Sequence, residues 1–156
     1  MSKRPSYINF DHKSYRKLLA SRYIIRGETG VLSYPYSKKI HPLWRFKTPA
    51  EAKSSARQIY SLFLKNLNSK ITPAKRFIQA DLCRKFLQMG YTRSMRYYYH
   101  KSGRKWGRVG NNWRLLPNDY DPIKKVSANI FKGYLLKALK NAKYVALKKW
   151  FVKKYH

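Results

Sequence analysis

The chain has 156 residues, 44% of them hydrophobic and 16% aromatic, so it can bury the core of one domain and is too apolar for a disordered polycation. Its 36 Lys and Arg against 6 Asp and Glu give a formal charge of +30, and both halves are basic. Such self-repulsion costs stability, and a bound polyanion relieves it. Nucleic acid is therefore the expected partner, with an anionic membrane surface as the main alternative. The codon bias of an AT-rich genome would enrich Lys, Tyr, Asn and Ile, but it would not explain the scarcity of Asp and Glu.

The composition also disfavours several classes of protein. A single cysteine, Cys83, excludes an internal disulfide framework and a cysteine-rich zinc site. The 4 histidines show no metal-ligand spacing, and no phosphate-binding glycine loop is present. No apolar run follows Met1, and none approaches the about 18 residues of a transmembrane helix. We expect a soluble protein of the cytoplasm, the nucleus or the interior of a virion, with no cofactor and no metal.

The N-terminal part predicts a β-hairpin. Residues 1–22 are a polar lead-in with a short helix expected around 15–20. Two short β-rich runs, 23–25 and 31–34, flank a glycine-containing loop, which is typical of a hairpin. Pro35 ends the second strand or places it at a sheet edge.

Two helix starts of the same kind follow. Thr48 to Glu51 form a capping box with Pro at the first helical position, which predicts a helix over 49–67. Thr72-Pro73 repeats the pattern and predicts a second helix with an apolar stripe. Gly90 suits a left-handed C-terminal stop for that helix.

The second half predicts further helices. A short helix is expected over about 93–100, followed by an irregular connection over about 103–120. Asp121-Pro122 opens another helix, and Asn141 interrupts it before a last basic segment, 142–154.

The sum is an α+β fold: a mainly α-helical single domain with a small N-terminal β-hairpin. We expect a lead-in over 1–22, a basic globular domain over 23–140 and a basic helical extension over 141–156.

Residues for catalysis are few. Acid–base or metal chemistry needs converging carboxylates, and Glu51 and Asp121 are expected to start helices. Asp81 is expected to pair with Lys85 one helical turn away. Cys83 with a distant histidine would make a nucleophilic pair, but its mid-helix position favours a small buried residue. We therefore expect no enzyme and assign no catalytic residue.

A binding surface is better supported. Residues 82–118 contain no acidic residue, nine Lys and Arg, and interleaved Tyr and Trp. Arg forks bind phosphate bidentately and aromatic rings stack on unpaired bases, although some of these rings must pack the core. The two helices around Gly90 also have a weak helix-turn-helix outline. After Asp121 the chain carries ten Lys, no Arg and no acid, which suits nonspecific phosphate neutralisation. The expected nucleic-acid-binding residues are Arg84, Lys85, Arg93, Arg96, Tyr97, Lys101, Arg104, Lys105, Trp106, Arg108, Arg114, Lys148 and Lys149.

Several motifs resemble an uncharacterised family of short proteins from bacteria, fungi, phages and large viruses. They are Trp-Arg-Phe-Lys-Thr-Pro at 44–49, the segment 84–93, and His-Lys-Ser-Gly-Arg-Lys at 100–105, with weaker matches at 27–30 and 127–131. The resemblance implies no established activity. Some phage members are labelled modifiers of suppressor tRNA, which points to RNA. The Lys-rich tail departs from the relatives, which are richer there in Glu and Asp.

The leading hypothesis is nonspecific binding of DNA or RNA, as in genome packaging or nucleoprotein organisation in a virion or nucleoid. A second is a structural role as a minor capsid or ribosome-associated protein, with virion or ribonucleoprotein proteins as partners. A third is a factor that modifies or processes tRNA or other RNA and uses His100 or Tyr residues near the Arg cluster.

Overall fold

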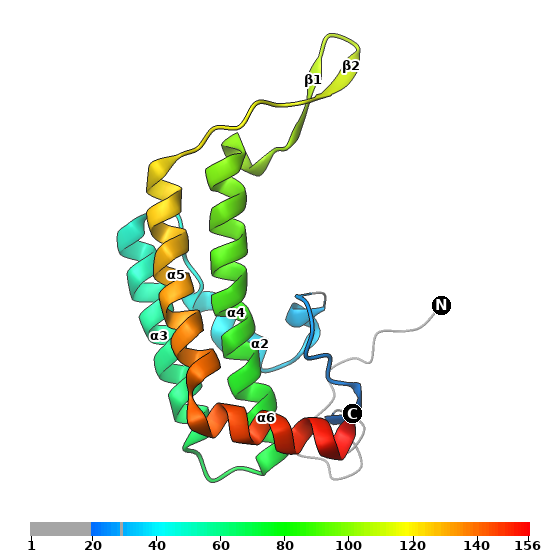
Figure 1. Ribbon diagram of the computed structural model, residues 1–156, viewed down its shortest axis with the longest axis vertical. Helices are drawn as coiled ribbons and strands as arrows, with labels where there is room; N and C mark the ends of the chain where they lie inside the picture. Colours follow the sequence, from blue (N-terminus) through cyan, green and yellow to red (C-terminus); the bar gives the residue numbers. More distant parts are fainter. Residues whose placement is uncertain (1–19, 29) are drawn as a thin grey trace.

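The computed structural model describes residues 20–28 and 30–156 and is mainly helical (Figure 1). Three long helices lie side by side, a fourth crosses them at one end, and a two-stranded antiparallel hairpin projects from the other end. The α+β, mainly helical class is confirmed, but the hairpin is not N-terminal. In chain order the elements are η1 (Val31–Ser33), α2 (Ser37–Ile40), η2 (His41–Leu43), α3 (Pro49–Leu67), α4 (Pro73–Tyr99), η3 (Lys101–Gly103), β1 (Trp106–Val109), β2 (Asn112–Leu115), α5 (Pro122–Lys140) and α6 (Ala142–Tyr155).

The helix starts agree with the capping residues. Thr48 Oγ1 accepts a hydrogen bond from the backbone N–H of Glu51 at 3.2 Å, so α3 begins where the capping box predicts. Asp121 caps α5 and Asn141 caps α6 in the same way, which confirms the interruption between these helices. Thr72 occupies the N-cap of α4, but its side chain makes no capping hydrogen bond.

The predicted N-terminal hairpin is wrong. The backbone carbonyl of Ile24 accepts a hydrogen bond from Lys85 Nζ, and that of Ile25 accepts one from Arg84 at 3.1 Å. Backbone groups that a strand partner would satisfy are thus satisfied by side chains of α4. The chain then turns into the short helix η1 instead of a second strand. The short helix expected around 15–20 lies outside the described residues, apart from residue 20.

Gly90 does not end a helix. Helix α4 runs without a break to Tyr99, so the separate helix over 93–100 and the helix-turn-helix outline are also wrong. A Cβ at Gly90 would lie 2.5 Å from Cγ and Cε1 of Phe131 on α5. The glycine therefore allows α4 and α5 to approach closely, which is a packing role and not a C-terminal stop.

An aromatic core joins the helices. Phe77 of α4 lies 4.5 Å from Phe151 and 6.0 Å from Tyr144 between ring centroids, and Phe63 of α3 lies 5.4 Å from Tyr144. All four rings are almost fully buried. Segment 141–156, expected as an extension, thus contributes two of its aromatic residues to this core. None of the helices in the described part of the chain is long and apolar enough to cross a membrane.

Candidate nucleic-acid interface

The hairpin presents two distinct faces. Trp106 pairs with Leu115 and Arg108 pairs with Trp113, so these four side chains share one face. Gly110, with φ of 64°, occupies the first central position of the two-residue turn and supplies the positive φ that a tight hairpin turn requires. The structure thus places a hairpin inside the segment for which the sequence predicted an irregular connection.

The shared face is apolar, aromatic and exposed. Trp106 is 55% exposed, Trp113 69% and Leu115 57%. A two-stranded hairpin without a packing partner is normally marginal, and these large apolar side chains gain only partial burial from this chain. Arg108 lies opposite Trp113 and two residues along the strand from Trp106, so the face combines aromatic rings with a guanidinium. We call Trp106, Arg108, Trp113 and Leu115 the tryptophan face.

The hairpin is anchored to the end of α4. Arg96 Nε donates a hydrogen bond to the carbonyl of Gly103 at 2.7 Å, where the chain leaves the helix. Where the chain returns, the N–H of Asp119 donates to the carbonyl of Tyr99 at 2.8 Å. Tyr120 packs on Tyr99 with ring centroids 6.0 Å apart. Both legs of the hairpin are therefore tied to the last turns of α4, which set the direction of the arm.

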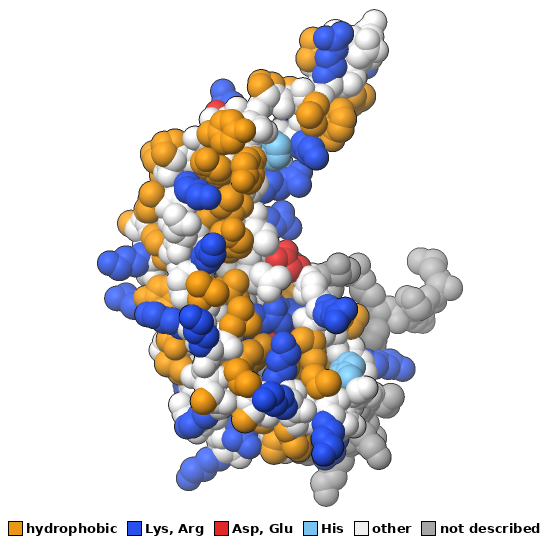
Figure 2. Space-filling model, viewed as in Figure 1, with side chains coloured by type: hydrophobic (Ala, Val, Ile, Leu, Met, Phe, Trp, Pro, Cys, Tyr) orange, Lys and Arg blue, Asp and Glu red, His pale blue; other side chains and the backbone are white. Residues whose placement is uncertain are grey.

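A basic groove runs along the last turns of α4 to the base of the arm. It has a volume of about 750 Å³ and is lined by Glu28, Tyr91, Thr92, Arg93, Met95, Arg96, Tyr99, His100 and Lys105. Its single carboxylate, that of Glu28, accepts a hydrogen bond from Thr92 Oγ1 at 3.0 Å. His100 Nδ1 is buried without a hydrogen-bond partner among the described residues. Figure 2 shows the molecule hollowed below the hairpin, with Lys and Arg side chains along this edge.

The groove and the arm contain most of the expected binding residues. Arg93, Arg96 and Lys105 line the groove, and all three are exposed. The remaining expected residues of this part of the chain, Lys101, Arg104, Trp106, Arg108 and Arg114, are exposed on η3, on the hairpin or just before it. Among the described residues, the arm and groove thus form one continuous basic and aromatic surface at one end of the molecule.

Arg84 and Lys85 do not belong to this surface, which corrects the sequence prediction. Both side chains are buried around Asp81, which is itself fully buried. Arg84 forms a salt bridge with Asp81 at 2.8 Å, and the hydroxyls of Tyr23 and Tyr144 donate to the same carboxylate. Asp81 therefore pairs with Arg84, and not with Lys85 as expected.

The pKa shifts in this cluster follow from its burial. Burial alone would lower the pKa of Arg84, but the Asp81 carboxylate outweighs it and raises that pKa. Burial and the charge of Asp81 raise the pKa of Tyr23 and Tyr144. Burial lowers the pKa of Lys85. This cluster joins the N-terminal segment, α4 and α6, so its role is to hold the fold together.

Three further expected residues lie elsewhere. The centroid of the half-buried Tyr97 ring lies 6.1 Å from that of Phe46 and 5.8 Å from Lys124 Nζ, so the ring faces α5 and the segment before α3. Lys148 and Lys149 are on α6, at the opposite end of the molecule from the hairpin (Figure 1). They therefore lie apart from the arm and the groove.

The sequence analysis counted Trp113 among the interleaved aromatic residues but not among the expected binding residues, and the structure places it beside Arg108 on the tryptophan face. Trp113 and Leu115 are two residues apart, and this alternation was the sequence signal that they share one face of a strand. Cys83 is fully buried, and burial raises the pKa of its thiol, which fits the expected small core residue. Within residues 20–28 and 30–156, no three His, Cys, Asp or Glu side chains are placed to hold a metal ion.

Comparison with known families gives one result. A domain of unknown function, DUF4385, matches residues 6–154, and the chain belongs to this family. This covers nearly the whole chain and confirms the expectation of an uncharacterised family. No curated protein and no solved structure matches the chain.

Proposed function

We propose that this DUF4385 protein binds nucleic acid without strong sequence preference, through its hairpin arm and the basic groove beside it. The observation that carries the proposal is the tryptophan face: two indoles more than half exposed, with Arg108 next to both in the register, on an arm without acidic residues. Exposed aromatic residues of this kind mark an interaction site. The positive charge around them selects an anionic partner.

The arginines and the tryptophans would have different roles in binding. Arg93 and Arg96 in the groove, with Arg104 just before the hairpin and Arg114 on it, offer forked donors that suit phosphate oxygens. The indoles offer flat faces on which unpaired bases stack regardless of sequence. Phosphate contacts supply affinity and no sequence information, so binding is nonspecific and strongly salt-dependent. This activity would serve genome packaging or nucleoprotein organisation.

One observation favours a second candidate, an RNA-processing or RNA-modifying activity. His100 has a buried Nδ1 without a described partner, and it lines the same groove as Arg93, Arg96 and Lys105. A histidine beside cations is the arrangement that acid–base chemistry on a phosphodiester would use. RNA that stays intact with the wild-type protein, or is processed equally by a His100→Ala variant, would argue against this role.

The test is a salt series with duplex DNA, single-stranded DNA and tRNA. We compare the wild type with an Arg108→Gln, Arg114→Gln double variant of the arm. The matched control is Lys53→Gln, Arg57→Gln, which removes the same charge from the exposed side of α3. Each lost phosphate contact should reduce the slope of log affinity against log salt by about 0.7–0.9.

The arm variant should bind more weakly with a shallower slope, while the control keeps nearly the wild-type slope. Equal losses in both variants would refute an interface on the arm. Binding that does not depend on salt would refute the electrostatic proposal altogether.

A further inference from the structure

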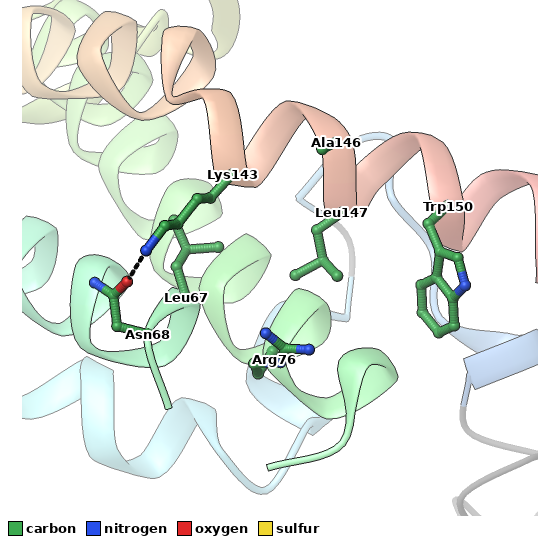
Figure 3. Close-up of a pocket in the computed structure, with 7 residues that line it drawn as sticks. All are labelled: Leu67, Asn68, Arg76, Lys143, Ala146, Leu147 and Trp150. Carbon is green, nitrogen blue, oxygen red and sulfur yellow. Dashed lines mark hydrogen bonds between the residues drawn. The ribbon is translucent and has the colours of Figure 1, made fainter. Parts of the chain in front are cut away.

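A second cavity lies at the end of the molecule opposite the hairpin. It has a volume of about 520 Å³ and is formed by the end of α3, the start of α4 and the helix α6 (Figure 3). Its lining combines two cations, an amide, an indole and aliphatic side chains. The residues are Leu67, Asn68, Arg76, Lys143, Ala146, Leu147 and Trp150. None of these carries a carboxylate.

Arg76 is the first unusual feature of this cavity. It lies in the first turn of α4, where the helix dipole is positive and a cation is disfavoured. That turn contains no acidic residue to compensate. Arg76 Nε is buried without a hydrogen-bond partner among the described residues. Figure 3 shows its guanidinium between the Asn68–Lys143 pair and Trp150, below Leu147.

Lys143 is likewise a cation at the start of a helix, the neighbouring helix α6. It lies in the first turn of α6, which also lacks an acidic residue, and its Nζ donates a hydrogen bond to Asn68 Oδ1. Two cations and the first turns of two helices thus converge on one cavity. A neutral acceptor such as Asn68 does not offset this charge, whereas a bound anion would.

The remaining wall of the cavity is apolar and aromatic. In Figure 3 Leu147 lies between Lys143 and Trp150, and Leu67 lies beside Lys143. Lys154 Nζ lies 5.2 Å from the centre of the Trp150 ring, which helps to hold the indole in place. A small inorganic anion would not use this wall. A ligand that carries both a phosphate and a flat ring would fill both parts of the cavity.

We propose that this cavity binds a phosphorylated nucleoside, with the phosphate at Arg76 and Lys143 and the base against Trp150. Two sources share this chemistry: a free mononucleotide and the 5′-phosphorylated end of a nucleic-acid strand. The site is separate from the arm and does not depend on the function proposed for it.

The test measures binding of AMP, inorganic phosphate and adenosine to the full chain by calorimetry. A salt concentration of about 0.3 M screens diffuse surface charge. Arg76→Gln, Lys143→Gln and Trp150→Leu each remove one part of the site. The matched control is Lys149→Gln, which removes one charge from the exposed side of the same helix, α6. If Arg76→Gln does not fold, the two α6 variants still test the site.

We expect AMP to bind more tightly than phosphate or adenosine. Loss of either cation should weaken AMP binding by about tenfold or more, as expected for a charged hydrogen bond, while Lys149→Gln has little effect. AMP binding no tighter than phosphate binding, or equal losses in Lys149→Gln and Lys143→Gln, would overturn the proposal.

Oligonucleotides with and without a 5′-phosphate identify the source of the ligand. Displacement of AMP only by the phosphorylated strand would support a strand-end site, and no displacement by either strand would support a free nucleotide. Equal displacement by both strands would overturn the site, since the phosphate would then play no part. The arm variant Arg108→Gln, Arg114→Gln should bind AMP normally, so failure at the arm and failure at this cavity give different results.

Discussion

Alanine substitutions at two helical glycines should have opposite effects on stability. Gly90 lies in α4 and Gly133 lies in α5. A Cβ at Gly90 would lie 2.5 Å from Cγ and Cε1 of Phe131, whereas a Cβ at Gly133 would meet nothing within 4 Å. The same chemical change therefore tests one close helix contact against an open position.

The magnitudes follow from two terms. Alanine stabilises a helix interior by about 0.5–1 kcal/mol relative to glycine, and Gly133→Ala should gain about that amount. Gly90→Ala gains the same helix-propensity free energy, but its new Cβ must displace Phe131, which is fully buried. Overpacking of this kind costs about 1–3 kcal/mol, so the net effect should be a loss of up to about 2.5 kcal/mol.

The assay is urea unfolding followed by circular dichroism, with the midpoint read at constant m-value. Each kcal/mol should also move the melting temperature by about 2–4 °C. In a Phe131→Ala background the penalty of Gly90→Ala should disappear, because the two substitutions act on one contact. If Gly90→Ala stabilises the wild-type protein as much as Gly133→Ala does, the close approach of α4 and α5 is refuted.

The other predictions concern the buried cluster and the arm. Asp81→Asn leaves Arg84 buried without its carboxylate and should cost about 3–5 kcal/mol in urea unfolding; a cost below about 1 kcal/mol would contradict the cluster. Burial and Asp81 raise the pKa of Tyr144, so in the folded state it stays protonated where the unfolded chain ionises. The stability that this protonated hydroxyl contributes is complete below pH of about 10 and is lost as the pH rises further. Tyr144→Phe should therefore flatten the fall of the unfolding free energy above this pH. An unchanged slope of unfolding free energy against pH would argue against the shift. Trp113→Ala should leave the free energy of unfolding nearly unchanged, since the side chain is 69% exposed. It should weaken binding of single-stranded DNA by about 1–3 kcal/mol relative to binding of duplex DNA. Equal losses of affinity for single-stranded and duplex DNA would exclude stacking.

Part of the candidate interface could be predicted from the sequence. An acid-free segment with alternating Arg and aromatic residues indicated a binding surface, and Arg93, Arg96 and Lys105 do line one groove. The sequence could not separate Arg84 and Lys85 from that set. A buried cation looks like an exposed one until its partners are known, and besides Asp81 these partners include backbone carbonyls about 60 residues away.

The local elements were determined by local chemistry. Capping residues such as Thr48 and Asp121 act within one turn of their own helix, so the sequence alone placed these helix starts correctly. The net charge and its distribution likewise need no structure.

Long-range contacts decided the rest. Gly90 is suited equally to ending a helix and to admitting a neighbouring ring, and only the position of Phe131 on α5 distinguishes the two roles. Ile24 and Ile25 have the composition of a strand, but side chains of α4 take their carbonyls. The sequence therefore determined the composition, the charge and the ends of the helices, because these depend on neighbours along the chain. The tertiary structure decided which charges are buried, where the hairpin forms and how closely the helices pack, because these depend on neighbours in space.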